Sequence, residues 1–386
     1  MKILLIFYGD FPDGNASIAR IKSLAKGCKR NEIDPFLLNV LPTYFDKNSS
    51  TNDTLDGKWE DIPFKNLILA KDYYKSKMHK VFYFFFVKLL SAIWLVKHRK
   101  DFDIVYFHLP SIYNSFHLFM LCKLLGIKTI VDQTEVQSFS GNKLRRKIHL
   151  IEEKLVAKYS NHIIAISNLG YKYFNSLSVQ SISRLATVVD LERFSPFLRT
   201  DKTHTIGYIG SYYDKDGIDT IIKGFEIAIE SNPKLTLKLI GAPSNPEKTN
   251  SLITNSRAFS NIHVVGKVTY EDIPAHLNEC DALIMNRTKS NFAQAGYPIK
   301  LGEYFATGRT VLMSDSGGFS NDFTHLNEAI IYNAESSQAF AEAICWRYEN
   351  YEQASKIGLN GLYYAQKHFD HIAVVDEFTN VIKTIK

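Results

Sequence analysis

Residues Ala295–Gly318 read AGYPIKLGEYFATGRTVLMSDSGG, and this order predicts a loop, a helix and then a strand. The loop is expected over Arg287–Tyr297. Pro298 suits the first helical turn, because its missing N–H would be unpaired there in any case. Gly308 suits the residue that ends a helix. A buried strand preceding a helix and another strand following it is the pattern of parallel α/β sheets.

Lys300 is the unusual residue of this stretch, because a cation in the first turn of a helix opposes the helix macrodipole. Its position is favourable if an anion binds there, held by Lys300 and by backbone N–H groups of the first turn. Glu303 lies three residues later and therefore on the same helix face. The alternative interpretation is a solvated Lys300–Glu303 pair on a surface helix.

The motif resembles the donor site of retaining glycosyltransferases with the GT-B fold, the group 1 members of glycosyltransferase family four. One branch carries a proline-x-lysine-x-x-glutamate-tyrosine helix followed by a small residue and glycine, and the matching residues are Pro298, Lys300, Glu303, Tyr304, Ala306 and Gly308. The resemblance implies that Glu303 accepts hydrogen bonds from the ribose of a nucleotide and that Lys300 contacts its diphosphate. It also implies two Rossmann-like doubly wound domains of class α/β that face a cleft, with a C-terminal helix crossing back to the first domain.

The two halves of the chain begin alike, each with a buried strand, a glycine-containing loop and an amphipathic helix. The strands expected in the first half are Lys2–Phe7, Ile104–Phe107, Thr129–Asp132 and His162–Ile166. Those expected in the second half are Thr205–Ile209, Thr236–Ile240, His263–Val265, Leu283–Met285 and Thr310–Met313. We therefore predict an acceptor-binding domain over 1–195, a nucleotide-sugar-binding domain over 196–370 and a returning helix over 371–386.

The composition sets wide limits on function. The chain has 386 residues, 45% of them hydrophobic, which is ample for two domain cores. Its four cysteines are scattered and form no disulfide framework or metal cluster, so we expect a cytoplasmic protein. The net charge of +6 is compatible with phosphate-bearing ligands or anionic lipid. We expect no nucleic-acid partner, because the basic residues cluster with a long apolar run and not with single aromatic residues suited to base stacking.

A departing diphosphate needs preorganised donors. Arg287, which follows a strand, is the second candidate after Lys300, with a solvated loop arginine as the alternative. Backbone N–H groups of Gly296 and Tyr297 are expected to join them. Further donor-binding positions are expected after the strands of the second half, at Gly210, Ser211, Gly266, Lys267 and Val268.

Three positions depart from the pattern of the family. A first glutamate is usual eight residues before Glu303, where this chain has Ala295. Many members carry an arginine and a lysine where this chain has Ser211 and Asp216. We therefore expect the diphosphate to depend more heavily on Lys300 and Arg287, with Lys215 as a neighbour that could compensate.

In the first half, Gly14 occupies the place of the glycine-rich first loop of the family, where backbone can approach a ligand closely. Arg20, in the helix that follows, is expected to point toward the cleft. His108 and Glu135 follow or end strands and are expected to face an acceptor hydroxyl, as ligand or as base. A packed polar residue is the alternative for His108.

We expect no required metal. Asp101-x-Asp103 and Asp214-x-Asp216 match the two-aspartate pattern of another glycosyltransferase fold, but they carry little weight in a GT-B chain.

Residues 71–100 hold eight Lys or Arg residues and a single acidic residue, Asp72. Within this segment Val81–Val96 is a run of 16 mostly apolar residues with Lys88 at its centre. The run is short for a membrane span, which needs about 20 apolar residues. We expect a helix lying at an anionic membrane surface, with a buried helix of the first domain as the alternative.

The sequence thus predicts a retaining glycosyltransferase that moves a sugar from a nucleotide-diphosphate donor to a carbohydrate or lipid-linked glycan. The expected setting is cell-surface polysaccharide or glycolipid synthesis at the cytoplasmic face of the inner membrane. Two alternatives stay open. One is a sugar-nucleotide epimerase of the same fold. The other is a non-catalytic nucleotide- or membrane-binding partner of an active transferase, which the replacements at Ser211, Asp216 and Ala295 favour.

Overall fold

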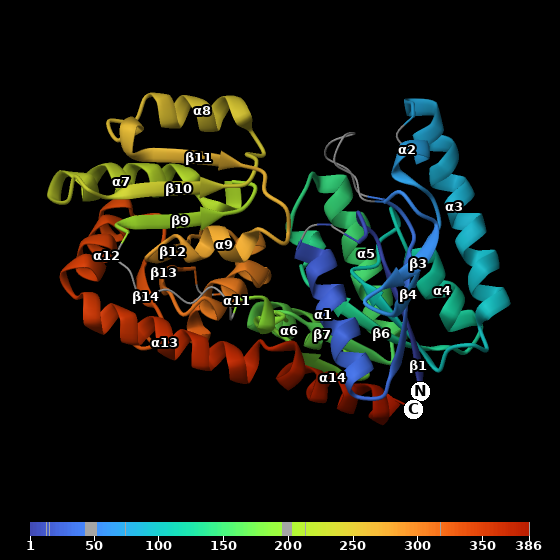
Figure 1. Ribbon diagram of the computed structural model, residues 1–386. Helices are drawn as coiled ribbons and strands as arrows, with labels where there is room; N and C mark the ends of the chain where they lie inside the picture. The colour runs from blue at the N-terminus through green and yellow to red at the C-terminus, as the bar shows by residue number, and fades with distance from the viewer. Residues whose placement is uncertain are drawn as a thin grey trace. The chain divides into compact units, whose positions relative to one another are not determined.

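The computed structural model describes residues 1–386 except 13, 15, 43–51, 74, 195–202, 213, 317 and 386. Contacts divide the chain into two compact units (Figure 1). Unit 1 is Met1–Val188 together with His371–Lys386, and unit 2 is Val189–Asp370. The predicted boundary at 195/196 lies outside the described residues.

Unit 1 is built on an eight-stranded sheet with the order β3-β4-β2-β1-β5-β6-β7-β8. The strands are β1 (Lys2–Phe7), β2 (Asp34–Asn39), β3 (Asp56–Trp59), β4 (Ile62–Asn66), β5 (Ile104–His108), β6 (Lys128–Gln133), β7 (His162–Ala165) and β8 (Ile182–Arg184). All neighbouring strands are parallel except the hairpin pair β3 and β4. The β1 strand KILLIF is buried beyond its first residue, as a central strand covered on both faces requires.

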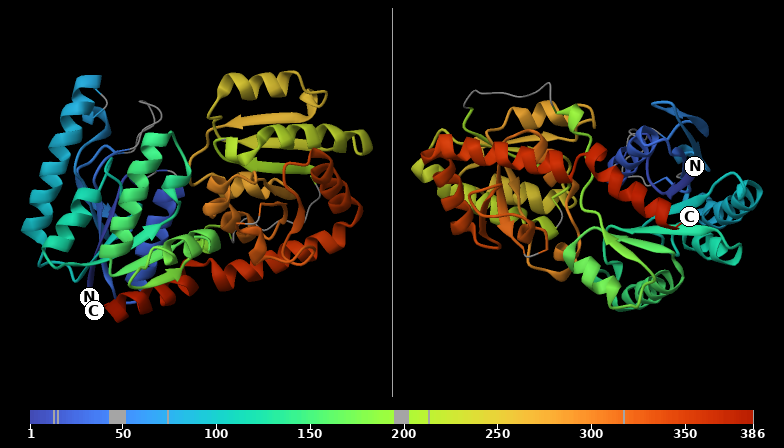
Figure 2. Two further views of the ribbon diagram at one scale, coloured as in Figure 1. Left: turned by 180° about the vertical axis from the view of Figure 1, so that it is seen from behind. Right: turned by 90° about the horizontal axis from the view of Figure 1, so that it is seen from below.

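Helices cover both faces of this sheet (Figures 1 and 2). They are α1 (Ala16–Arg30), α2 (Ala70–Tyr73), α3 (Lys77–His98), α4 (Phe116–Leu124), α5 (Lys143–Tyr159), α6 (Asn168–Asn175) and α14 (His371–Ile385). The terminal helix α14 packs against α1, where a Cβ on Gly27 would lie 1.8 Å from a methyl carbon of Val375. Its buried residues recur at helical spacing, so one apolar stripe faces the core of unit 1.

Unit 2 carries a six-stranded, wholly parallel sheet with the order β11-β10-β9-β12-β13-β14. The strands are β9 (Thr205–Ile209), β10 (Thr236–Ile240), β11 (Ile262–Gly266), β12 (Ala282–Met285), β13 (Thr310–Asp315) and β14 (Ile330–Asn333). The chain starts at β9, winds outward to β11, and then returns to β12 on the other side of β9. The reversal between β9 and β12 is the point at which ligands bind in doubly wound sheets.

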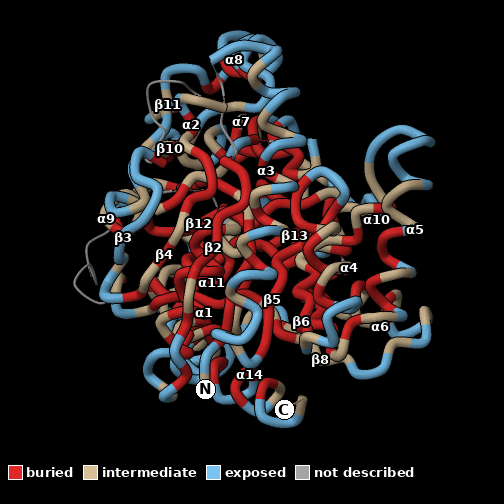
Figure 3. The backbone as a smooth tube through the Cα atoms, turned by 90° about the vertical axis from the view of Figure 1, so that its right-hand side faces the viewer, coloured by how far each residue is buried: buried red, intermediate tan, exposed pale blue. Residues whose placement is uncertain are grey.

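The helices of unit 2 are α7 (Ile218–Ser231), α8 (Pro246–Thr254), α9 (Ile273–Asn278), α10 (Asn291–Ala295), α11 (Ile299–Ala306), α12 (Ser337–Glu349) and α13 (Tyr351–His368). Among these helices, α7 packs against α12, and α11 packs against α13. Each unit has its own cluster of buried apolar side chains, and buried backbone follows the strands in Figure 3.

The segment around Pro298 differs in two respects from the prediction. The expected loop Arg287–Tyr297 contains the short helix α10, capped by the Ser290 hydroxyl, which accepts a hydrogen bond from Ala293 N at 3.3 Å. Five residues are too few to show helical periodicity in the sequence. Pro298 is the N-cap of α11, with an extended ψ of 122°, so the helix begins one residue later than predicted. Gly308 follows the last turn with a φ of +66°, as expected of a residue that ends a helix.

Candidate active site

The residues predicted to bind a donor lie at the carboxyl ends of β9 and β12, where the strand order of unit 2 reverses. Gly210 follows β9, and Asn286 and Arg287 follow β12. Helix α11 begins nearby and carries Lys300 as its second residue. The Tyr304 hydroxyl of α11 accepts a hydrogen bond from Ile209 N at 2.9 Å, which anchors the helix to the end of β9.

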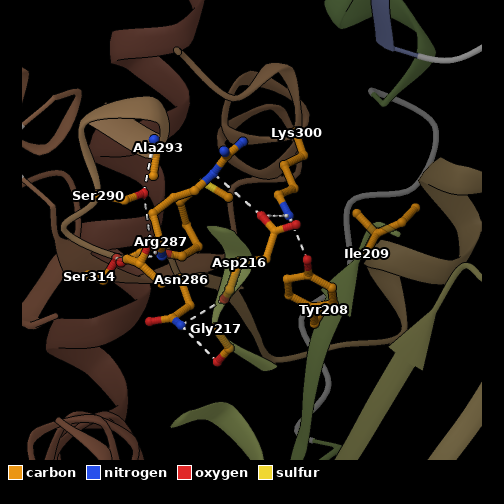
Figure 4. Close-up of polar contacts among 12 residues, drawn as sticks. Tyr208, Ile209, Asp216, Gly217, Asn286, Arg287, Ser290, Ala293, Lys300 and Ser314 are labelled. Carbon is orange, nitrogen blue, oxygen red and sulfur yellow. Dashed lines mark hydrogen bonds and ion pairs between the residues drawn. The ribbon is translucent and has the colours of Figure 1, made fainter. Parts of the chain in front are cut away.

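Lys300 extends from the first turn of α11 toward β9 (Figure 4). Its Nζ lies 2.9 Å from the Tyr208 hydroxyl and 3.4 Å from Asp216 Oδ1. Its side chain is only 13% exposed, so it is not the solvated surface lysine of the alternative interpretation. Gly210 makes room for it, because a Cβ at that position would lie 3.1 Å from Lys300 Nζ and the residue has a φ of +155°.

Asp216 lies between the two predicted cations, as Figure 4 shows. Its Oδ1 is 3.4 Å from both Lys300 Nζ and Arg287 Nε, and its side chain is 5% exposed. Position 216 lacks the cation that is usual in the family, and its carboxylate is buried in contact with Lys300 and Arg287. Lys215 turns to the Phe292 ring, with its Nζ 4.9 Å from the ring centroid.

Side chains from neighbouring strands fix the loop that carries Asp216. Asn286 Nδ2 donates to the carbonyl oxygens of Asp216 at 2.8 Å and Gly217 at 3.1 Å. The Tyr332 hydroxyl donates in turn to Asn286 Oδ1 at 2.9 Å. Arg287 N donates to Ser314 Oγ at 2.7 Å. The carboxylate and the guanidinium are therefore held by backbone and side-chain contacts that a ligand does not have to create.

Burial and charge act in opposite directions on this cluster. Burial lowers the pKa of Lys300 to about 8, although Asp216 raises it, and Arg287 and Lys215 add to the lowering. Burial raises the pKa of Asp216, but Lys300 and Arg287 outweigh it and hold that pKa below its ordinary value. Lys300, Arg287 and Asp216 together carry a net charge of +1. This charge is too small to neutralise the negative charge of a diphosphate.

Glu303 lies on α11, one turn after Lys300, and is buried. Its Oε1 is 3.9 Å from Arg193 Nη1, which is beyond hydrogen-bond distance. Arg193 stacks 3.5 Å above the Tyr270 ring centroid and donates to the Tyr270 carbonyl oxygen at 2.5 Å. Burial raises the pKa of Glu303, with Arg193 and Lys300 opposing it. Neither Arg193 nor Tyr270 was predicted as a site residue, because their approach to Glu303 joins segments far apart in the chain.

Glycine ends three neighbouring strands of unit 2. Gly210, Gly241 and Gly266 have φ values of +155°, +112° and +83°. A Cβ on Gly241 would lie 2.1 Å from the Gly210 carbonyl oxygen, so the backbones approach closely there. Gly241 N donates to Gly266 O at 2.7 Å. The carboxyl edge from β9 to β11 is thus bare backbone, which permits close approach of a planar group. Lys267, Val268 and Ser211 flank this edge, and Lys267 and Ser211 are exposed.

Residues 190–362 match the model of the family described as glycosyl transferases group 1. The match is a little under half of the 386 residues and covers nearly all of unit 2. Unit 2 is therefore similar to the group 1 glycosyltransferases over nearly its whole length.

Solved structures of the same fold cover the whole chain. Sucrose-phosphate synthase from Thermosynechococcus elongatus has a TM-score of 0.76 at 14% identity, covering 100% of this chain and 98% of its own. HepE from Anabaena, solved with UDP-glucose, has a TM-score of 0.73 at 13% identity and full coverage of both chains. A glycosyltransferase from Rickettsia africae has a TM-score of 0.69 at 13% identity, covering 100% and 98%. At these identities the likeness establishes the GT-B fold. No curated protein sequence matches the chain.

The remaining donor-site predictions concern the end of α10. Ala295, where the first family glutamate is usual, is buried, so a longer charged side chain would have to displace its neighbours. The Tyr297 side chain is also buried, with its ring packed edge-on to Phe319 and Phe369. Because the Tyr297 side chain is packed away, any donor contact at Gly296 and Tyr297 would come from the backbone, and the donor role of these two positions stays a prediction.

The residues predicted to contact an acceptor are in unit 1. His108 ends β5, but its ring is buried, with Nδ1 3.7 Å from Asp132 Oδ2. Glu135 follows β6 and is partly exposed. Burial of the Tyr8 phenol raises its pKa to about 12, and the negative charge of Glu135 adds to this increase. Gly14 is explained by packing, because a Cβ there would lie 2.3 Å from both Asp10 O and an Ile18 side-chain carbon.

The expectation that Arg20 points toward the cleft is wrong. Its guanidinium is fully buried, with Nε 2.6 Å from Asp132 Oδ2 and Nη2 3.1 Å from the Leu185 carbonyl oxygen. The Tyr106 hydroxyl donates to the same carboxylate. This network ties α1 to β5 and β6, so Arg20 serves the unit 1 core.

The two aspartates of Asp214-x-Asp216 point to different partners. Asp214 is exposed and pairs with Lys248 at 3.1 Å, whereas Asp216 is buried against Lys300. Within the described ranges, no group of three or more His, Cys, Asp or Glu side chains is placed to hold a metal ion.

Proposed function

We propose that this glycosyltransferase takes a sugar from a nucleotide-diphosphate donor and transfers it, with retention, to a carbohydrate or lipid-linked glycan. The observation that carries the proposal is the placement of Lys300 and Glu303 at the topological switch point of unit 2. A cation and a carboxylate one turn apart on α11 fit the diphosphate and the ribose hydroxyls of one nucleotide. The role of each group follows from its charge: Lys300 and Arg287 stabilise the departing diphosphate, and Glu303 accepts hydrogen bonds from ribose.

Uridine diphosphate is the first nucleotide to test, because the fold relative HepE has been solved with UDP and with UDP-glucose. Most of the edge from Gly210 to Gly266 offers backbone groups rather than side chains, so it gives no direct code for the base. Cations on the protein, Lys300 and Arg287, supply the positive charge in this proposal, and we expect no divalent metal to be required.

The acceptor is proposed to bind unit 1 near the carboxyl ends of β1 and β6, where Tyr8 and Glu135 lie close enough for the carboxylate to affect the phenol. Retention does not need a protein base, because an oxygen of the leaving diphosphate can accept the proton of the acceptor hydroxyl on the same face. We place the reaction in surface polysaccharide or glycolipid synthesis on the cytoplasmic side of a membrane.

The deciding experiment is calorimetric titration with UDP, GDP, ADP, TDP and CMP. We expect one nucleotide to bind selectively and Glu303→Ala to weaken it, since a buried acceptor of ribose hydrogen bonds is lost. Glu342→Ala, an exposed glutamate on α12, is the matched control and should leave affinity unchanged. Equal affinity of the Glu303→Ala variant and the wild type would contradict the assignment of the donor site.

A non-catalytic nucleotide-binding role is the second candidate, and Asp216 is the observation that favours it. Its carboxylate lies against the two cations expected to receive a diphosphate. Selective nucleotide binding without donor hydrolysis or transfer to any glycan in a product assay by mass spectrometry would support this role. Release of free nucleotide with a glycosylated product would reject it.

A further inference from the structure

Helix α3 of unit 1 is apolar and long. Its 22 residues include an 18-residue window with a mean hydropathy of 1.5, of which only 17% is buried. By length and composition it meets the criterion for a membrane span, a test that core helices of soluble proteins also pass. Helix α3 differs from such core helices because so little of this window is buried, which raises the question of what covers its exposed apolar face.

One face of α3 belongs to unit 1. Val87, Ser91 and Leu95, spaced by four, are its buried residues. Ser91 Oγ is 2.9 Å from His117 Nε2 on α4. These contacts hold the helix lengthwise along the unit, which is not the position of a helix that crosses a bilayer on its own.

The opposite face is an apolar strip open to solvent. Its large residues recur every three or four positions and are Met78, Val81, Phe82, Phe85, Phe86, Leu89, Ile93 and Val96. The exposed fractions are 61% at Phe82, 66% at Phe85 and 61% at Leu89. A contiguous strip of this size is unusual on a monomeric surface and marks an interaction site.

Lys88 does not interrupt this outer strip, although it lies at the centre of the apolar run. Its Nζ donates to the Ile112 carbonyl oxygen at 2.9 Å and lies 4.0 Å from the Phe84 ring centroid. The charge is thus folded back toward the protein. A shallow hollow of about 440 Å³ continues the apolar surface from Ile93 and Val96 to Leu121 of α4, with Lys97 and Arg99 at its rim.

Basic side chains border both ends of the strip. Lys75, Lys77 and Lys80 are exposed at its start, and Lys97, Arg99 and Lys100 are exposed at its end. A second copy of this chain is a poor partner, because parallel or antiparallel pairing of two such helices brings like charges together. An apolar strip with cations at both ends matches a surface of acyl chains beneath anionic headgroups.

We infer that α3 docks unit 1 on an anionic lipid bilayer, with its axis along the membrane plane and its outer strip at the level of the upper acyl chains. The inference stands on unit 1 alone and does not depend on the donor chemistry of unit 2. Vesicle co-sedimentation of the full chain tests it, with phosphatidylcholine alone and with phosphatidylcholine mixed with phosphatidylglycerol. We expect sedimentation with the mixed vesicles, reduced by high salt.

The triple variant Phe82→Ser/Phe85→Ser/Leu89→Ser removes the centre of the strip and should lower partitioning at least tenfold. Its fold should persist, since these side chains are more than half exposed. The matched control replaces exposed apolar residues elsewhere, Phe259→Ser/Leu359→Ser/Tyr363→Ser, and should partition as the wild type does.

Charge is tested in the same way. Lys75→Gln/Lys77→Gln/Lys80→Gln should weaken binding to the mixed vesicles, whereas the same change at the exposed Lys223, Lys234 and Lys367 should not. No sedimentation of the wild type, or equal sedimentation of the serine variant, overturns the inference. The inference is also overturned, in favour of self-association, if light scattering shows that the wild type is a dimer, the serine variant is a monomer, and neither binds vesicles. Retention in membranes after alkaline carbonate extraction overturns the flat orientation.

Discussion

Replacing Asp216 by asparagine should change both the strength and the pH dependence of donor binding. The substitution keeps the shape of the side chain and removes a negative charge that contacts both Lys300 and Arg287. A bound diphosphate would no longer be repelled by that carboxylate. Lys300 would also lose the neighbour that supports its protonated form, while its burial and the charges of Arg287 and Lys215 remain.

The magnitude follows from the contact distance. At 3.4 Å and an effective dielectric constant of about 20, Coulomb's law bounds the interaction of Lys300 with Asp216 at about 5 kcal/mol. Even a third of that exceeds the ~1.4 kcal/mol that corresponds to one pKa unit. The pKa of Lys300 starts at about 8, so its midpoint in the variant should fall by at least about one pH unit.

The sign is fixed by the charge that binds. A donor anion prefers protonated Lys300, so wild-type affinity should decline as pH rises through about 8. In Asp216→Asn the decline should begin at lower pH, and in mildly acidic solution the variant should bind more tightly than the wild type. Tyr208 does not contribute to this range, because burial, with the charges of Asp216 and Tyr304, holds its pKa well above the ordinary value.

Titration calorimetry with UDP-glucose between mildly acidic and mildly alkaline pH is the assay, since this diester has no ionisation of its own in that range. Asp214→Asn is the control, because it removes the same charge from the same loop at an exposed site paired with Lys248. Superimposable pH profiles for wild type and Asp216→Asn would refute the reasoning. So would a shift of equal size in Asp214→Asn.

Three further substitutions test other parts of the structure. Lys300→Ala should lower turnover severely with little change in the thermal unfolding midpoint, since the lost contacts are the polar ones to Asp216 and the Tyr208 hydroxyl; normal turnover would remove it from the mechanism. Gly241→Ala should destabilise unit 2 by about 2–4 kcal/mol in denaturant unfolding, because its Cβ would meet the Gly210 carbonyl oxygen at 2.1 Å at a φ of +112°, and an unchanged midpoint would contradict this. Arg20→Met should cost unit 1 about 3–5 kcal/mol by leaving Asp132 buried without its main partner. The pKa of Asp132, now low because Arg20 and His108 outweigh burial, should rise in the variant, so its stability should fall as pH increases from acid to neutral, and a flat profile would argue against the pair.

Much of the fold was predictable because patterns of neighbouring residues in the sequence determine its main strands and helices. The bounds of β1, β9, β10 and α14 agree with the expectation from apolar runs and helical spacing. Five strands were not predicted, namely β2, β3, β4, β8 and β14. Two of them carry no buried apolar run, since β3 is mostly exposed and β8 is a three-residue, half-buried strand. Helix α10 was not predicted because its five residues are too few to show a helical period.

The donor site divides in the same way. The spacing of Lys300 and Glu303 on one helix was legible, because residues three apart share a face. Lys300 and Asp216 are in contact although they are 84 positions apart in the chain, and no local sequence pattern predicts such a contact. An aspartate in place of a cation therefore looked like a loss, whereas the structure makes it a partner of the cations that remain.

The sequence by itself determined the alternation of strands and helices, the helix that carries Lys300 and Glu303, and the apolar run with its basic flanks. These are properties of neighbouring residues, and the periods of the helix and the strand express them directly. Only the tertiary structure decided that Arg20 serves the core, that Asp216 contacts two cations, and that the Phe82 face of α3 lies open while Lys88 turns inward. Each of these depends on which distant strands pair, and strand pairing is settled by the packing of the whole unit.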